Sequence, residues 1–99
     1  MTSVAAQTIQ TISAEFHLSE ETVIQESLKV FLEKKLREIK TDIFKLYGKY
    51  SITSVEALES RFENGTLEEQ DALGDYHKLD HLEFKRDEMM SLLQKSLVD

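Results

Sequence analysis

Two histidines one helical turn apart are the most chemically distinctive residues of this 99-residue chain. His77 and His81 stand at i and i+4 with Asp80 beside them, and two imidazoles at that spacing on a helix can share a metal ion. The segment lacks the glutamate that follows the first histidine in zinc metalloproteases. There is no cysteine, and His17 is distant in sequence. We therefore predict no metal or other cofactor, and interpret both histidines as surface or interface residues.

Carboxylates are plentiful, but their sequence context does not favour catalysis. None of the 19 acidic residues adjoins a glycine-rich turn or stands in an apolar run that would raise its pKa. No serine or threonine has the context of a nucleophile elbow, and no glycine-rich loop could cradle a phosphate. The sequence thus predicts a protein that is not an enzyme and that acts by binding.

A small basic cluster, Lys34, Lys35 and Arg37, is the candidate nucleic-acid site. Lysines and arginines of this kind bind phosphates. Glu33 and Glu38 are interleaved with the cluster, and a Lys34–Glu38 pair at i, i+4 would cancel part of its field. A solvated face of mixed charge is therefore favoured over nucleic-acid binding.

The net charge of −7 is unevenly distributed along the chain. Residues 20–50 carry seven bases and six acids, whereas residues 51–99 carry five bases and twelve acids. Such a C-terminal half should repel nucleic acid and attract a basic protein. The alternative interpretation is an acidic surface that only aids solubility.

These residues must be positioned by helices, and one stretch, from Ser19 to about Tyr50, dominates the pattern. It contains no proline, and its apolar residues recur at alternating steps of four and three, as on one face of a helix. About thirty helical residues would be about 45 Å long. A compact domain of this size has a radius of gyration near 13 Å, so part of the apolar stripe should need a second subunit. The alternative is a monomeric bundle in which the last helix covers the stripe.

The apolar stripe therefore defines the predicted interface of a homodimer. Its members are Ile24, Leu28, Phe31, Leu32, Leu36, Ile39, Ile43 and Leu46.

Shorter helices are predicted on both sides of this stretch. Residues 4–16 have the spacing of a short amphipathic helix, and Ser19 is a good N-cap for the long one. Thr53 and Glu56 match a capping box, which predicts a helix that ends at Asn64-Gly65. Thr66 and Glu69 match a second box. Residues 67–74 are acidic and thinly apolar, and predict a helical turn or a mobile link.

A last helix is predicted from about Asp75 to Leu97, apolar on more than one side. Arg86 falls on its main stripe, where it either extends its charge to solvent or meets an acid across an interface. We expect this helix to bind a partner protein. The predicted partner-binding residues are Tyr76, Leu79, His81, Phe84, Arg86, Met89 and Met90.

Taken together, the patterns predict an all-α protein with a long central helix, a short N-terminal helix, and two or three helices after residue 53, forming a dimeric helical bundle. Residues 1–52 would be the dimerisation region, and residues 53–99 the acidic partner-binding region. No stretch is apolar and long enough to span a membrane or resemble a signal peptide, so we expect a soluble cytoplasmic protein.

The N-terminal passage resembles the helical part of ribbon-helix-helix proteins over residues 5–35. The resemblance is carried by Ile9, Ile12 and Phe16, then Leu18-Ser19-Glu20-Glu21, then Ile24, Ser27-Leu28, Phe31 and Leu32. It implies an obligate dimer of interlocked helices. That family reads DNA with a short N-terminal strand, and residues 1–6 here supply no basic or alternating strand.

Nearly the whole chain also resembles a group of small, acidic, all-helical proteins that are usually taken to be antitoxins of type II toxin–antitoxin modules. The order of four segments carries this resemblance: Leu32 to Ile39, Tyr47-Gly48-Lys49-Tyr50, Ser54 to Glu59 followed by Asn64-Gly65, and Leu79 to Asp87. It implies a dimer whose acidic C-terminal part covers a toxin enzyme, often a ribonuclease. We therefore expect an antitoxin-like inhibitor. The alternatives are a dimeric DNA-binding transcriptional regulator and a structural helical adaptor.

Overall fold

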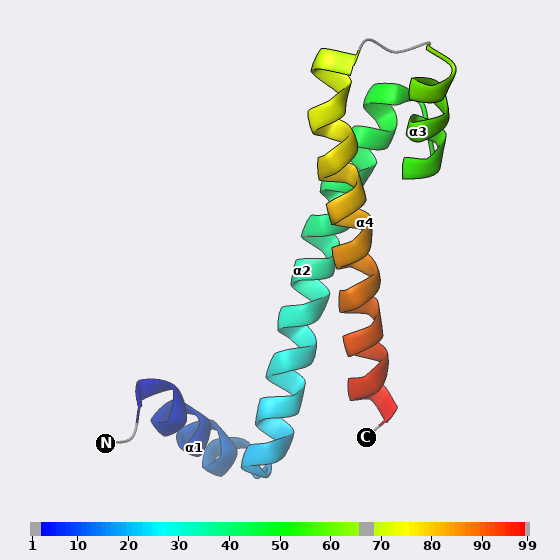
Figure 1. Cartoon of the computed structure of the whole chain (residues 1–99). Coiled ribbons are helices and arrows are strands. Elements are labelled where there is room, and N and C mark those ends of the chain that lie inside the picture. The colour runs from blue at the N-terminus through cyan, green and yellow to red at the C-terminus, as the bar shows by residue number, and fades with distance from the viewer. Residues whose placement is uncertain (1–2, 66–68, 99) are drawn as a thin grey trace.

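The computed structural model describes residues 3–65 and 69–98, and the described chain contains helices and no strand. The helices are α1 (Val4–Phe16), α2 (Glu20–Tyr50), α3 (Val55–Glu63) and α4 (Glu69–Val98), as Figure 1 shows. The prediction of an all-α fold with a long central helix, a short helix before it and two helices after it is confirmed. The predicted capping box at Thr66 lies outside the described residues.

Local capping sets both ends of the long helix α2. The Ser19 side chain accepts a hydrogen bond from the Thr22 backbone N–H at 3.0 Å, as predicted for an N-cap. At the other end Ser51 adopts a left-handed conformation with φ of 52°, and its N–H donates to the Tyr47 carbonyl. This left-handed residue turns the chain out of α2 towards α3.

Two predicted helix starts need correction. Ser54, not Thr53, is the N-cap of α3, and its side chain accepts a hydrogen bond from the Ala57 N–H at 3.2 Å. The predicted capping box is therefore wrong, because with Ser54 as the N-cap the third helical residue is Ala57 and not Glu56.

The last helix begins at Glu69 rather than near Asp75. Residues 67–74 were predicted to form a helical turn or a mobile link, and those from Glu69 onward belong to α4, where Ala72 is buried. Residues 67 and 68 lie outside the described residues.

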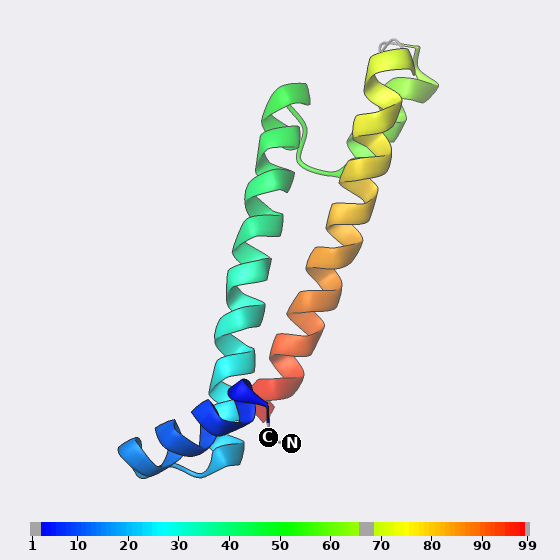
Figure 2. The ribbon, with the colours of Figure 1, turned by 90° about the vertical axis from the view of Figure 1, so that its left-hand side faces the viewer.

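The two long helices α2 and α4 run antiparallel along an elongated molecule of 61 × 29 × 20 Å (Figures 1 and 2). The radius of gyration is 19.7 Å, far above the value of about 13 Å for a compact domain of this size. α3 lies beside one end of the pair, and α1 crosses the N-terminal end of α2 and turns away from α4.

The hydrophobic core lies at the α3 end of the molecule. There the last part of α2, all of α3 and the first part of α4 enclose the buried cluster, in which Leu58 and Leu79 are 0% exposed. The cluster consists of Ile43, Leu46, Ile52, Val55, Leu58 and Leu79. α1 contributes no buried residue, so the molecule has one packed end and one open end.

Candidate functional site

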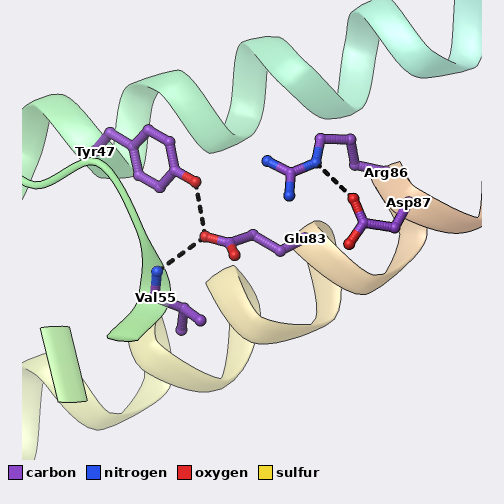
Figure 3. A network of polar contacts seen from close by, with 5 residues as sticks. All are labelled: Tyr47, Val55, Glu83, Arg86 and Asp87. Atoms are coloured by element: carbon purple, nitrogen blue, oxygen red, sulfur yellow. Dashed lines mark hydrogen bonds and ion pairs between the residues drawn. The ribbon is translucent and has the colours of Figure 1, made fainter. Parts of the chain in front are cut away.

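One carboxylate joins three helices at the packed end. Glu83 on α4 accepts a hydrogen bond from the Tyr47 hydroxyl on α2 at 2.7 Å, and another from the Val55 N–H at 2.9 Å (Figure 3). Val55 is the first residue of α3, where a negative charge is favoured by the exposed amides and the helix dipole. Burial, and then the Glu83 carboxylate, raise the pKa of Tyr47. Glu83 therefore ties the start of α3 to both long helices.

Asp75 makes a second polar link between α2 and α4. Its carboxylate accepts hydrogen bonds from Lys49 Nζ at 2.7 Å and from the Tyr50 hydroxyl at 2.5 Å. The bond from Lys49, followed by that from Tyr50, lowers the pKa of Asp75. Spacing in sequence could not identify either link, because the partners lie 25 to 36 residues apart.

The two histidines lie on the surface of α4. Both are exposed, and the His77 ring meets Tyr76 edge-on with a centroid distance of 5.5 Å. Within residues 3–65 and 69–98, no three histidine or acidic side chains gather as they would to hold a metal ion.

The predicted partner-binding residues divide between the core and the surface. Leu79 is fully buried in the core, so its assignment as a partner anchor was wrong. Tyr76 is half-buried and packs edge-on against Phe62 at 5.7 Å. His81 and Met90 are exposed, and Phe84 is 65% exposed. The Leu79 error arose because the first half of α4 is covered by α3, which the apolar pattern of α4 alone could not reveal.

The remaining two residues of that prediction are half-buried. Arg86 donates from Nε to Asp87 at 3.0 Å, so it pairs with an acid of its own helix (Figure 3). Met89 is also half-buried. One turn further on, α4 carries a shallow hollow of about 460 Å³ lined by Asp87, Met90, Ser91, Leu93 and Gln94.

The predicted dimer interface also divides between the two ends. Ile43 and Leu46 are buried in the chain's own core, so they were wrongly assigned to an interface. α3 and α4 cover this part of the stripe, which the length of α2 alone did not predict. Ile39 packs against the same core. Two residues, Leu32 and Leu36, are half-buried, and the remaining three, Ile24, Leu28 and Phe31, are exposed.

A larger apolar surface lies between α1 and the start of α2. A hollow of about 690 Å³ there, the hairpin hollow, is lined by Ile12, Phe16, Leu18, Val23, Glu26, Ser27 and Val30. The exposed large hydrophobic side chains of this end are Val4, Ile12, Phe16, Leu18, Ile24, Leu28, Val30 and Phe31. The predicted dimer interface did not include Phe16 or Val30, although residues 4–16 have the spacing of an amphipathic helix.

The basic cluster lies on the exposed surface of α2. Lys35 bonds to Glu38 at 3.4 Å and lies over the Phe31 ring at 5.6 Å, so Glu38 pairs with Lys35 rather than with Lys34 as predicted. Lys34 and Arg37 line a shallow depression together with the acids Glu38 and Asp42. The interleaved acids thus lie among the cations, as they do in the sequence.

The fold and its surfaces define an elongated all-helical protein with one packed end and one open apolar end. The chain belongs to the Uncharacterized protein MJ0235 family, whose family model matches residues 1–98. A relative described as "Uncharacterized protein MJ0235", from Methanocaldococcus jannaschii, is 26% identical over 76 residues, which cover 77% of this chain and 92% of the relative. No solved structure gives a significant match. In the described parts of the chain, no helix is both long and apolar enough to cross a membrane.

Proposed function

We propose that the chain is a non-catalytic binding protein, an antitoxin-like inhibitor that uses α4 to cover a basic surface of a partner enzyme. The observation that carries this proposal is an exposed aromatic side chain in the acidic C-terminal half of the chain. Phe84 is 65% exposed on α4, within residues 51–99, which hold twelve acids and five bases.

The surroundings of Phe84 suit a basic partner. Asp80 and Glu88 stand one turn before and one turn after it on the same helix, and both are exposed. Exposed aromatic side chains are the common anchors of protein interfaces, because their burial contributes much of the binding energy. Complementary charge raises the association rate and excludes partners of the wrong sign. Phe84 would therefore anchor the complex, and the acids around it would steer the partner.

The polar links of the packed end support this role for α4. Glu83 and Asp75 hold the helix to α2 through direct hydrogen bonds, so the exposed face of α4 is presented on a braced scaffold. A surface fixed in this way loses little conformational entropy on binding. Met90 and Leu92 are exposed apolar residues in the C-terminal half of the same helix.

The test is an affinity purification of the tagged full chain from its native cells at low salt, followed by an assay of the captured protein. We expect a basic protein in stoichiometric amount, whose enzymatic activity falls as the chain is added back. Phe84→Asp should abolish capture, whereas Phe44→Asp should not. Phe44 is 77% exposed on α2 and serves as the matched control. Full activity of the captured enzyme in an excess of the chain would refute inhibition.

A DNA-binding regulator, the alternative class, predicts a different result. It requires a shift of duplex DNA that weakens steeply with salt and that depends on Lys34, Lys35 and Arg37. The acids Glu38 and Asp42 beside these cations do not favour this alternative.

A further inference from the structure

The hairpin of α1 and α2 combines an apolar hollow with acidic surroundings. Among the residues that line the hairpin hollow Glu26 is the charged one, and the apolar Phe16 and Val30 are 65% and 63% exposed. All the lining residues belong to α1, to α2 or to the turn between them. α4 returns to this end of the molecule (Figures 1 and 2), but none of its described residues lines the hollow. The hollow is therefore open to another molecule.

Charge at the hollow selects the chemistry of its occupant. Residues 1–28 contain four glutamates and no lysine or arginine, and all four glutamates are exposed. The first base, Lys29, lies 3.9 Å from Glu33 on its own helix, so it does not compensate them. Among residues 89–98 of α4 the one charged residue is Lys95, so the acids prevail at this end. An apolar surface with such surroundings favours a basic protein and disfavours nucleic acid and anionic lipid.

The walls of the hollow favour a helix as the occupant. Both walls are helices, whose backbone N–H and C=O groups bond within each helix and leave only side chains for recognition. The described chain has no sheet edge with which an extended peptide could pair. A helix satisfies its own backbone groups and can lay an apolar face into a groove. We propose that the hairpin hollow binds an amphipathic helix of a basic protein, whose lysines and arginines meet the four glutamates of the hairpin.

The turn between α1 and α2 shapes the hollow before any occupant arrives. The Ser13 carbonyl accepts the Leu18 N–H at 3.0 Å, and the Ser13 hydroxyl donates to the Leu18 carbonyl. His17 between them is left-handed, with φ of 54°. α1 nevertheless has no buried residue, and a helix of its 13 residues is marginal without packing. The occupant would supply that packing as a third helix, so the amides of α1 should exchange with solvent more slowly in the complex.

This site is separate from Phe84 on α4, so the inference goes beyond the proposed inhibition and does not rest on it. The probe is a labelled peptide of about fourteen leucine and lysine residues, whose leucines recur with the period of a helix face and whose length matches α1 at about 20 Å. A second peptide of the same pattern carries glutamate in place of lysine. Fluorescence anisotropy measures the binding of each peptide to the full chain.

We expect the lysine peptide to bind, more weakly as salt rises, and the glutamate peptide not to bind. Phe16→Ala and Glu26→Lys should each raise the dissociation constant about tenfold or more. Phe44→Ala removes another exposed aromatic side chain outside the hollow and should leave the constant unchanged. Circular dichroism shows whether each variant keeps its helices, and Val30→Ala replaces Phe16→Ala should that variant fail to fold.

Hydrogen exchange of the α1 amides locates the bound peptide. Binding that is weakened by Phe84→Ala and not by Phe16→Ala would place the peptide on α4 and overturn the proposal. Equal binding of the glutamate peptide would overturn it as well, because charge would then not select the occupant. A free chain that dimerises, and whose dimer is broken by Phe16→Ala, would assign the hollow to a second copy instead. Capture of an enzyme through Phe84 is measured separately, so the two proposals fail independently.

Discussion

Glu83 caps the start of α3 although it belongs to α4. An N-cap side chain normally satisfies the amides of its own helix, and Ser54 does so for Ala57. The Val55 amide is left for Glu83, which lies 28 residues away and also receives the Tyr47 hydroxyl. Its removal should therefore leave an amide and a hydroxyl without partners, both in partly buried positions.

We predict that Glu83→Ala destabilises the protein by about 2 kcal/mol, because loss of the shared acceptor leaves two partly buried donors unsatisfied. Glu83→Gln retains an acceptor oxygen and should cost about half as much. Glu88→Ala removes an exposed acid of the same helix and should change stability by less than about 0.5 kcal/mol. Urea unfolding followed by circular dichroism measures all three. Equal stability of the Glu83→Ala and Glu88→Ala variants would show that the Glu83 bonds contribute nothing.

Asp75 should give the protein a specific acid sensitivity. Its hydrogen bonds from Lys49 and Tyr50 hold its pKa below the ordinary value of 3.8, so the folded state favours the charged carboxylate. The resulting stability is fully present above that value and is lost as the pH falls through the lower folded-state pKa. Asp75→Asn should be less stable than the wild type at neutral pH, by up to about 1 kcal/mol because Lys49 is largely exposed.

The difference between Asp75→Asn and the wild type should shrink on acidification below about pH 4. Urea midpoints at neutral pH and at about pH 3 make the comparison. A gap that stays constant with pH would mean that the charge of Asp75 contributes nothing.

At the scale of the element, α2 is one continuous helix whose two halves have different surroundings. Its C-terminal half is buried by α3 and α4, and its N-terminal half carries exposed apolar residues on the side of α1. Local sequence signals predicted both of its ends: Ser19 caps the start, and the helix ends at Tyr50, where the helical pattern of the sequence ends. These signals act within one turn, which is why they could be identified without the structure.

The end of α2 contains a residue in a costly conformation. Ser51 has φ of 52°, a region that glycine enters without the steric penalty of a side chain. Ser51→Gly should therefore stabilise the protein by about 0.5 to 1 kcal/mol, after the larger unfolded-state entropy of glycine is subtracted. Ser51→Ala keeps the Cβ atom and should be nearly neutral. Thermal unfolding compares them, and a Ser51→Gly variant that melts below the Ser51→Ala variant would contradict the argument.

The sequence predicted the helices and the apolar faces of α1 and α2. It did not predict which residues of those faces are buried in the core and which are exposed. The stripe that includes Leu28 and Ile43 is continuous, yet Leu28 is exposed and Ile43 is buried. The difference comes from the tertiary fold, because Ile43 belongs to the core cluster that α2 forms with α3 and α4, and Leu28 does not. Leu79 was misassigned for the same reason. Periodicity shows which face of a helix is apolar, whereas the element that covers it is a property of the tertiary fold.

At the scale of the whole molecule, stability and association should respond to different residues. Leu58 is fully buried at the packed end, and Leu28 is 54% exposed at the open end. Leu58→Ala should cost about 2 to 5 kcal/mol at any protein concentration, because it leaves a cavity in the core. Leu28→Ala should be nearly neutral in dilute protein and should lower the melting temperature only where the predicted homodimer is populated.

Melting curves of both variants and the wild type at low and high concentration separate these effects. If Leu28→Ala is as destabilising in dilute protein as Leu58→Ala, the two ends are not energetically distinct.

The location of the tyrosines makes one end of the molecule optically visible. The chain has three tyrosines and no tryptophan. Tyr47, Tyr50 and Tyr76 all pack against the core at the α3 end. Intrinsic fluorescence therefore reports on the packed end alone, and events at α1 leave it unchanged. A single tryptophan introduced at Phe16 would emit at longer wavelength from the opposite end, so that one sample would report unfolding of the core and changes at α1 at two separate emission wavelengths.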